Sequence, residues 1–77
     1  MPKWNEELYS MMEKLVEADL ELALKINATA HFLKRNPLSG ELAIKPNTRY
    51  YTDPDGQFRL SYEIEKGDIL ITVIHLF

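Results

Sequence analysis

Four side chains in the second half of the chain are of types that can do chemistry, namely Arg49, Tyr51, Arg59 and His75. Arginine carries a permanent positive charge, whereas tyrosine and histidine can release or take up a proton. Each also has an ordinary role on a sheet: Arg59 can face water or pair with Glu63, and a histidine near a strand end often packs or caps. The chemical interpretation therefore requires that these side chains share one face.

The turn at Asp53–Gly56 predicts how the first pair of strands is aligned. Aspartate, proline and glycine at its first, second and fourth places are typical of a type I turn, with the glycine in the left-handed conformation of a three-residue hairpin loop. Such a loop pairs Tyr51 with Arg59 and Arg49 with Ser61, and directly opposed side chains lie on the same face. The sequence therefore predicts two guanidiniums and a phenol together on the face away from the core.

The turn at Glu65–Asp68 leaves two alignments of the last strand open. A three-residue loop ending in Gly67 places His75 on the same face as Arg59. A two-residue Lys66-Gly67 loop places it on the helix-packed face, but requires Lys66 at positive φ, which is unfavourable for lysine. We favour the first alignment, which also brings an apolar row to the open face that another chain would cover. That row consists of Ile69, Ile71, Val73 and Phe77.

The elements that must position these side chains change in type at Asn36–Gly40. Before this junction, from residue 3 onward, the chain has no glycine or proline and consists mostly of good helix formers, which predicts helices over about residues 5–35. Asn5 is the expected N-cap of the first helix and Asp19 that of the second. A kink around Ala18–Asp19 folds them into a hairpin, because one continuous helix would be about 45 Å long and would outreach the sheet. A single long helix, the alternative, implies a dimer or a swapped assembly.

After the junction, β-branched and aromatic residues predominate and predict strands. The first runs irregularly from Glu41–Lys45 into Thr48–Thr52, the second spans about Gln57–Glu65 and the third Asp68–Phe77. Their expected core-facing residues on the first hairpin are Tyr50, Phe58, Leu60, Tyr62 and Ile64. The sequence thus predicts a single α+β domain over residues 1–77, an N-terminal helical hairpin packed on a three-stranded antiparallel β-sheet (about 41–77). Too few residues precede the first helix for us to expect a strand there.

The composition narrows the class of protein. A chain of 77 residues with 45% apolar content is typical of one globular domain. It has no cysteine, no apolar run near the roughly 20 residues of a membrane span and no signal-peptide start, so a cytoplasmic location is the default. The net charge of −3 argues against a dedicated nucleic-acid binder. Because metal-ligand spacings and a glycine-rich phosphate loop are missing, we expect no cofactor and no metal.

Motifs at the junction and on the strands resemble those of the RelE/ParE toxin superfamily. In the segment FLKRNPLSGEL, the leucine, proline and glycine that the family carries after its second helix are matched by Leu33, Pro37 and Gly40. The penultimate strand of the family carries aromatic-Arg-hydrophobic-x-Tyr, which Phe58-Arg59-Leu60-Ser61-Tyr62 matches at every place. Val73-Ile74-His75 is similar to the Val-x-His ending of ParE-like members. The resemblance covers about residues 8–77.

The resemblance implies the toxin half of a bacterial type II toxin–antitoxin pair, neutralised by an antitoxin that covers the open sheet face. In RelE-like ribonucleases the strand arginine is an active-site group, so Arg59 would stabilise the charge that develops when a 2′-OH attacks ribosome-bound mRNA. Tyr51 or His75 would transfer protons, with Arg49 beside them. ParE-like toxins instead bind DNA gyrase without cleavage, so whether this chain is an enzyme stays open.

A non-catalytic interaction protein on the same scaffold is the alternative function. The apolar row and the exposed edge strands would make such a protein oligomeric, with a homodimer as the simplest form. The acidic balance of the chain favours this alternative, whereas the intact strand motif favours the toxin.

Overall fold

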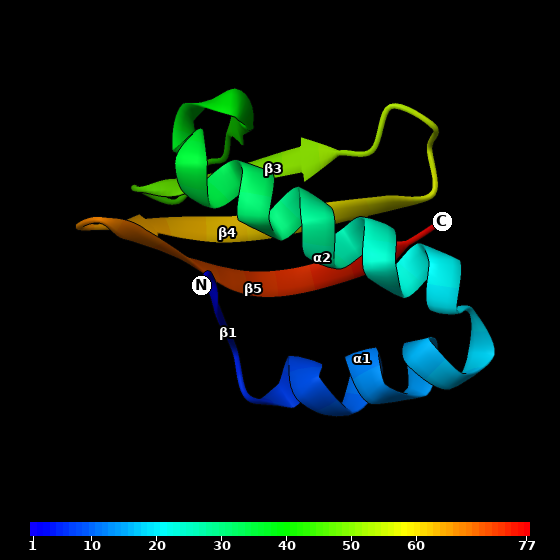
Figure 1. The fold of residues 1–77 in the computed structure, drawn as a ribbon. Helices are drawn as coiled ribbons and strands as arrows, with labels where there is room; N and C mark the ends of the chain where they lie inside the picture. The colour runs from blue at the N-terminus through cyan, green and yellow to red at the C-terminus, as the bar shows by residue number, and fades with distance from the viewer.

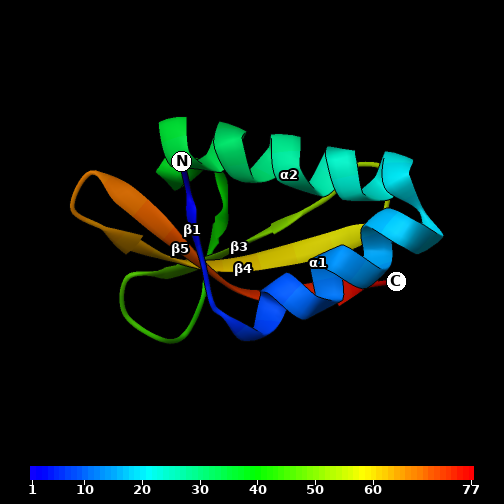
Figure 2. The ribbon, with the colours of Figure 1, turned by 60° about the horizontal axis from the view of Figure 1, so that its bottom comes forward.

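The computed structural model places all 77 residues in an α+β fold (Figure 1). Its elements are, in chain order, β1 (Lys3–Trp4), α1 (Glu7–Ala18), α2 (Leu20–Arg35), the 3-10 turn η1 (Pro37–Ser39), β2 (Glu41–Leu42), β3 (Thr48–Thr52), β4 (Phe58–Glu65) and β5 (Asp68–Leu76). α2 lies over one face of the sheet and α1 runs beside β5, so the opposite face carries no helix (Figures 1 and 2). No helix combines the length and the apolar character needed to cross a bilayer.

The helical hairpin is confirmed, with its kink at the predicted place. Asp19 leaves the helical conformation at φ −155°, and its Oδ1 accepts a hydrogen bond from the Leu22 N–H at 3.1 Å, so it caps α2 as expected. The predicted cap at Asn5 is wrong. α1 begins at Glu7 without a side-chain cap, because the Asn5 N–H donates to the Ile71 carbonyl at 2.9 Å and Asn5 extends the pairing of β1 along β5.

The sheet has five strands in the order β1-β5-β4-β3-β2, so the predicted three-stranded sheet is correct only for its centre. There, β3, β4 and β5 pair antiparallel as predicted. The expectation of no strand before the first helix is wrong. Lys3 and Trp4 pair in parallel with Leu70 and Ile71, across the long connection that parallel pairing requires. β1 has two residues, too few to leave an alternating pattern in the sequence. β2 lies within the first predicted strand, which instead folds back on itself, so that Glu41 and Leu42 pair antiparallel with Tyr50 and Arg49 of β3.

One hydrophobic core joins the helices to the sheet. Its twelve buried residues are Leu8, Leu15, Ala23, Ile26, Ala30, Leu33, Phe58, Leu60, Tyr62, Ile69, Ile71 and Ile74. Tyr62 fixes the helix–sheet junction, because its hydroxyl donates to the Pro37 carbonyl at 2.6 Å and accepts from the Gly40 N–H at 3.0 Å. Burial raises the pKa of Tyr62 and keeps this hydroxyl protonated. A Cβ at position 40 would collide with the hydroxyl, so the junction requires glycine.

Candidate functional site

The β3–β4 hairpin differs by one residue from its predicted alignment. Gly56 has φ +74° and its N–H donates to the Asp53 carbonyl at 2.8 Å, so the predicted turn is confirmed. The loop has four residues rather than three, because the first hydrogen bond of the ladder joins the Asp53 N–H to the Phe58 carbonyl at 2.9 Å. Arg59 therefore lies opposite Thr52. A shift by one residue moves every side chain of the partner strand to the other face.

The carboxylate of Asp53 accounts for the longer loop. It is 3% exposed and accepts hydrogen bonds from the Gln57 N–H and from Lys25 Nζ, both at 3.1 Å. Lys25 also reaches Asp55 at 2.7 Å, a contact that raises the pKa of the lysine. Burial alone would raise the pKa of Asp53, but the Gln57 N–H and Lys25 outweigh it and hold that pKa below its usual value. Because the Gln57 N–H donates to this carboxylate, it does not form the backbone hydrogen bond that would pair Gln57 with Asp53 in a three-residue loop.

The predicted pair of arginines on the open face is therefore wrong. Arg49 lies opposite the buried Tyr62, and its guanidinium donates to the Gly40 carbonyl at 2.7 Å on the helix side of the sheet. Tyr51 also faces the core, with its ring centroid 6.1 Å from that of Phe32. Both residues support the packing of helix on sheet, and neither lies on the open face.

The β4–β5 hairpin also closes differently from the favoured prediction. Its loop has two residues, with Gly67 at φ +74° and Lys66 at a negative φ, so the strain foreseen for this lysine does not arise. Ile69 and Ile71 consequently lie in the core. The predicted apolar row on the open face is wrong for these two residues.

A β-bulge then returns the end of β5 to the predicted face. Ile71 pairs with Tyr62 and Val73 pairs with Ser61, so Thr72 is one extra residue on β5 between these two pairs. Beyond the bulge the side chains change faces, so His75 lies opposite Arg59 on the open face, as predicted. The members of the predicted apolar row that stay exposed are Val73 and Phe77.

Arg59 stands at the centre of a group of side chains on the open face, which we call the Arg59 cluster. Its members are Tyr50, Thr52, Arg59, His75 and Phe77. The guanidinium donates from Nε to Thr52 Oγ1 at 3.0 Å, and its Cζ lies 5.0 Å from the Tyr50 ring centroid and 5.6 Å from that of Phe77. The ring centroids of His75 and Phe77 are 4.8 Å apart. Two rings and a hydroxyl thus hold the guanidinium in place.

The charge of Arg59 is not neutralised by a carboxylate. Glu63, its predicted ordinary partner, instead pairs with Lys45 at 3.4 Å, and none of the five ion pairs of the structure includes Arg59. Glu41, beside the hydroxyl of Tyr50, raises the pKa of Tyr50, so this phenol stays protonated as a donor. The cluster therefore offers a fixed cation and an imidazole to an anionic ligand such as a phosphate, while the phenolic O–H of Tyr50 is directed at Glu41.

The predicted site omits Tyr50, Thr52 and Phe77. The expected core-facing position of Tyr50 is wrong, because Tyr50 lies opposite Ser61 on the open face and contacts Arg59. A four-residue loop would have predicted Tyr50 and Thr52, but its cause is the contact of Asp53 with Lys25, which lies 28 residues away in the chain and leaves no local pattern. Phe77 was predicted on the open face, but as a member of the apolar row and not of the site.

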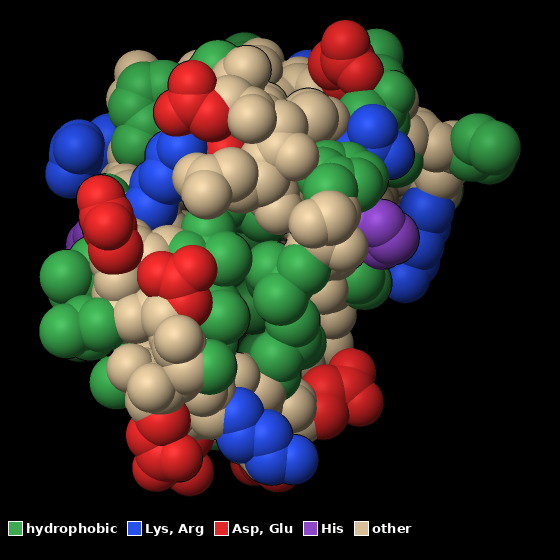
Figure 3. Space-filling view, turned by 90° about the vertical axis from the view of Figure 1, so that its right-hand side faces the viewer, with side chains coloured by type: hydrophobic (Ala, Val, Ile, Leu, Met, Phe, Trp, Pro, Cys, Tyr) green, Lys and Arg blue, Asp and Glu red, His purple; other side chains and the backbone are tan.

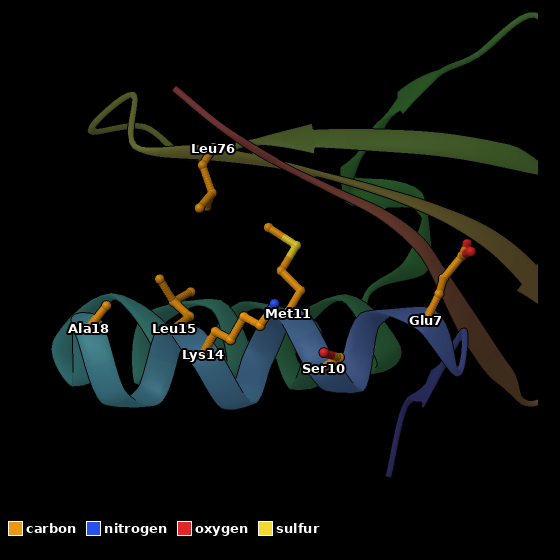
Figure 4. A pocket seen from close by; sticks show the side chains of 7 residues that line it. All are labelled: Glu7, Ser10, Met11, Lys14, Leu15, Ala18 and Leu76. Atoms are coloured by element: carbon orange, nitrogen blue, oxygen red, sulfur yellow. The ribbon is translucent and has the colours of Figure 1, made fainter.

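Apart from the Arg59 cluster, a groove of about 460 Å³ lies between α1 and the end of β5 (Figure 4). Met11 and Leu15 point from α1 toward Leu76 across this groove. One acid and one base, Glu7 and Lys14, also line it, so its charge does not indicate which ligand would occupy it.

No protein-family model matches this chain, and no curated protein matches it either. Its fold does have a match among solved structures. The crystal structure of the isolated E. coli RelE toxin superposes on this chain with a TM-score of 0.76 at 12% sequence identity. The match covers 99% of this chain and 82% of the RelE chain. At this identity the likeness concerns the fold alone. The chain thus has a RelE-like fold, as the motifs at the junction and on β4 led us to expect.

Proposed function

We propose that this chain is the toxin of a bacterial type II toxin–antitoxin pair and that its open sheet face cleaves mRNA on the ribosome. The observation that carries this proposal is the state of Arg59, a cation without a carboxylate partner on the face that carries no helix. A planar guanidinium binds a phosphate through two parallel hydrogen bonds, which makes the RNA backbone a fitting ligand. The RelE-like fold supports the same choice.

Arg59 and His75 act together because they form a cross-strand pair, so both reach the same phosphate. Arg59 stabilises the negative charge that develops on the phosphate as the neighbouring 2′-OH attacks it. His75 either takes the proton from the attacking 2′-OH or gives one to the 5′-oxygen that leaves as its bond to phosphorus breaks. Since Thr52 and two rings already hold the guanidinium, little reorganisation precedes the reaction.

Induction of the gene alone in a bacterium tests this function. Arg59→Ala abolishes growth arrest, whereas Arg49→Ala, the same change on the helix-covered face, retains it because the guanidinium of Arg49 donates to carbonyls at the junction after α2. Primer extension on mRNA from the arrested cells reveals the cleavage sites. Arrest that survives Arg59→Ala would contradict a role of the Arg59 cluster.

The second candidate function is binding of a protein target without cleavage, as ParE-like toxins bind DNA gyrase or as an interaction module would. Two exposed apolar side chains favour it, since Val73 and Phe77 are 49% and 62% exposed beside Arg59. The net charge of −3 also works against RNA binding. Growth arrest without cleaved mRNA would support target binding, and no arrest would support the interaction module.

A further inference from the structure

The outer side of the helical hairpin carries an apolar strip that shares no residue with the Arg59 cluster. Three of its side chains, Val16, Leu20 and Leu24, are 46%, 54% and 59% exposed, and Met12 lies half-buried one turn before Val16. Figure 3 looks at the end of the molecule that carries the α1–α2 turn and shows hydrophobic side chains in the lower half of the view, with acidic side chains beside them. We call these four residues the helix seam.

The other flanks of the two helices are already occupied, which fixes where the helix seam lies. On α2, Lys25 contacts the β3–β4 loop and Phe32 contacts β3, so this flank faces the sheet. On α1, Met11 and Ala18 line the groove beside β5. By helix periodicity the seam residues occupy the two remaining flanks, which adjoin each other where α1 and α2 pack together.

The borders of the helix seam are acidic. Glu13 and Glu17 on α1 and Glu21 on α2 are exposed, and none of them takes part in an ion pair. Asp19 adds a fourth carboxylate at the turn between the helices. Like charges would oppose a second copy of this surface, and they would equally oppose an anionic membrane. With a second copy and an anionic membrane excluded, the partner that complements this surface carries positive charges along an apolar face.

We infer that the helix seam binds a basic amphipathic helix of a partner protein. Its apolar side chains, spaced at i, i+3, i+4 and i+7, would lie along the strip between α1 and α2, as amphipathic helices do in apolar grooves. Its lysines or arginines would meet Glu13, Glu17 and Glu21. This surface shares no residue with the Arg59 cluster, so binding here can be measured whether or not the chain cleaves RNA.

A synthetic amphipathic helix of leucine and lysine, labelled for fluorescence anisotropy, is the probe. The same helix with glutamate in place of lysine is its control. We expect the acidic helix to bind at least about tenfold more weakly, and added salt to reduce this difference. Leu20→Gln with Leu24→Gln weakens binding of the basic helix at least about tenfold. Leu38→Gln with Leu42→Gln, a matched change of leucines that are 70% and 75% exposed, leaves binding unchanged.

Charge reversal supplies an independent variant. Glu17→Lys with Glu21→Lys makes the acidic helix the tighter ligand, and circular dichroism shows whether each variant keeps its fold. Equal affinity for the two helices, no binding of either, or binding that survives both seam variants would overturn the inference. A dimer in sedimentation that Leu20→Gln with Leu24→Gln dissociates would overturn it too, because a second copy would then occupy the helix seam.

Discussion

Each face of the sheet carries one arginine of the β3–β4 hairpin, and the surroundings of the two arginines differ. On the helix-covered face, Arg49 donates to the Gly40 carbonyl and lies opposite the buried Tyr62. On the open face, Arg59 contacts Thr52 and two aromatic rings and no carboxylate. The two residues are of one type and belong to one hairpin, so their difference comes from the alignment of the strands. Alignment, more than residue type, decides which guanidinium is free for a ligand.

Activity should depend most strongly on the open face. If His75 transfers a proton as proposed, His75→Ala lowers the rate of mRNA cleavage on purified ribosomes by about 10²- to 10⁴-fold. The side chain is exposed, so the temperature of unfolding should not change. Ser61→Ala, on the same face, is the control and should leave both quantities unchanged. A reduction below about tenfold would leave the Arg59 cluster as a binding surface without acid–base chemistry.

Stability should depend most strongly on the covered face, and β5 offers a matched pair on either side of its bulge. Ile71 is fully buried and Val73 is 49% exposed. Ile71→Ala should lower the free energy of unfolding by about 2–5 kcal/mol, because it leaves a cavity in the core. Val73→Ala should cost less than about 1 kcal/mol. Urea unfolding measures both, and equal costs would show that Thr72 does not form the bulge.

Local sequence signals predicted the elements, because the contacts that form them are local. Asp19 caps the helix that begins at the next residue, and Gly56 takes its left-handed conformation inside a four-residue turn. The alignment of the strands depends on distant contacts and was predicted less well. The carboxylate of Asp53 lengthens its loop because Lys25 of α2 holds it there. No pattern around the turn reveals that contact.

The candidate site was predicted in part. For His75 the prediction was correct only because two errors, one in the loop length and one in the missed bulge, compensate each other. Arg59 lies on the open face as expected from the alternation along β4. His75 lies there too, although its loop is one residue shorter than the favoured prediction, because the bulge at Thr72 reverses the effect. Arg49 and Tyr51 had no such compensation, so their predicted placement failed.

The link between Asp53 and Lys25 should make the fold less stable at low pH. The pKa of Asp53 is held below its usual 3.8, so the ionised carboxylate contributes stability that is full above that value and is lost as the pH falls through the lower pKa of the folded state. Asp53→Asn should remove this dependence and lower the free energy of unfolding at neutral pH by about 1.5–3 kcal/mol. Urea unfolding over a series of pH values measures both effects.

The matched control for this change is Asp55→Asn, because Asp55 binds the same lysine through a side chain that is 76% exposed. Solvent screens an exposed ion pair, so we expect a change within about 0.5 kcal/mol. If the two substitutions cost the same, burial of Asp53 would not be the reason for its effect on stability.

The smallest expected effect compares the two arginines directly. Arg49→Met should lower the free energy of unfolding by about 1 kcal/mol, because the Gly40 carbonyl loses a charged donor while the methionine keeps most of the packing. Arg59→Met should change it by less than about 0.5 kcal/mol, since the residue is exposed. Thermal and urea unfolding of both variants measure the difference. Equally small costs for the two variants would place Arg49 on the open face beside Arg59 and would restore the three-residue loop, because that alignment moves the side chains of β3 to the other face.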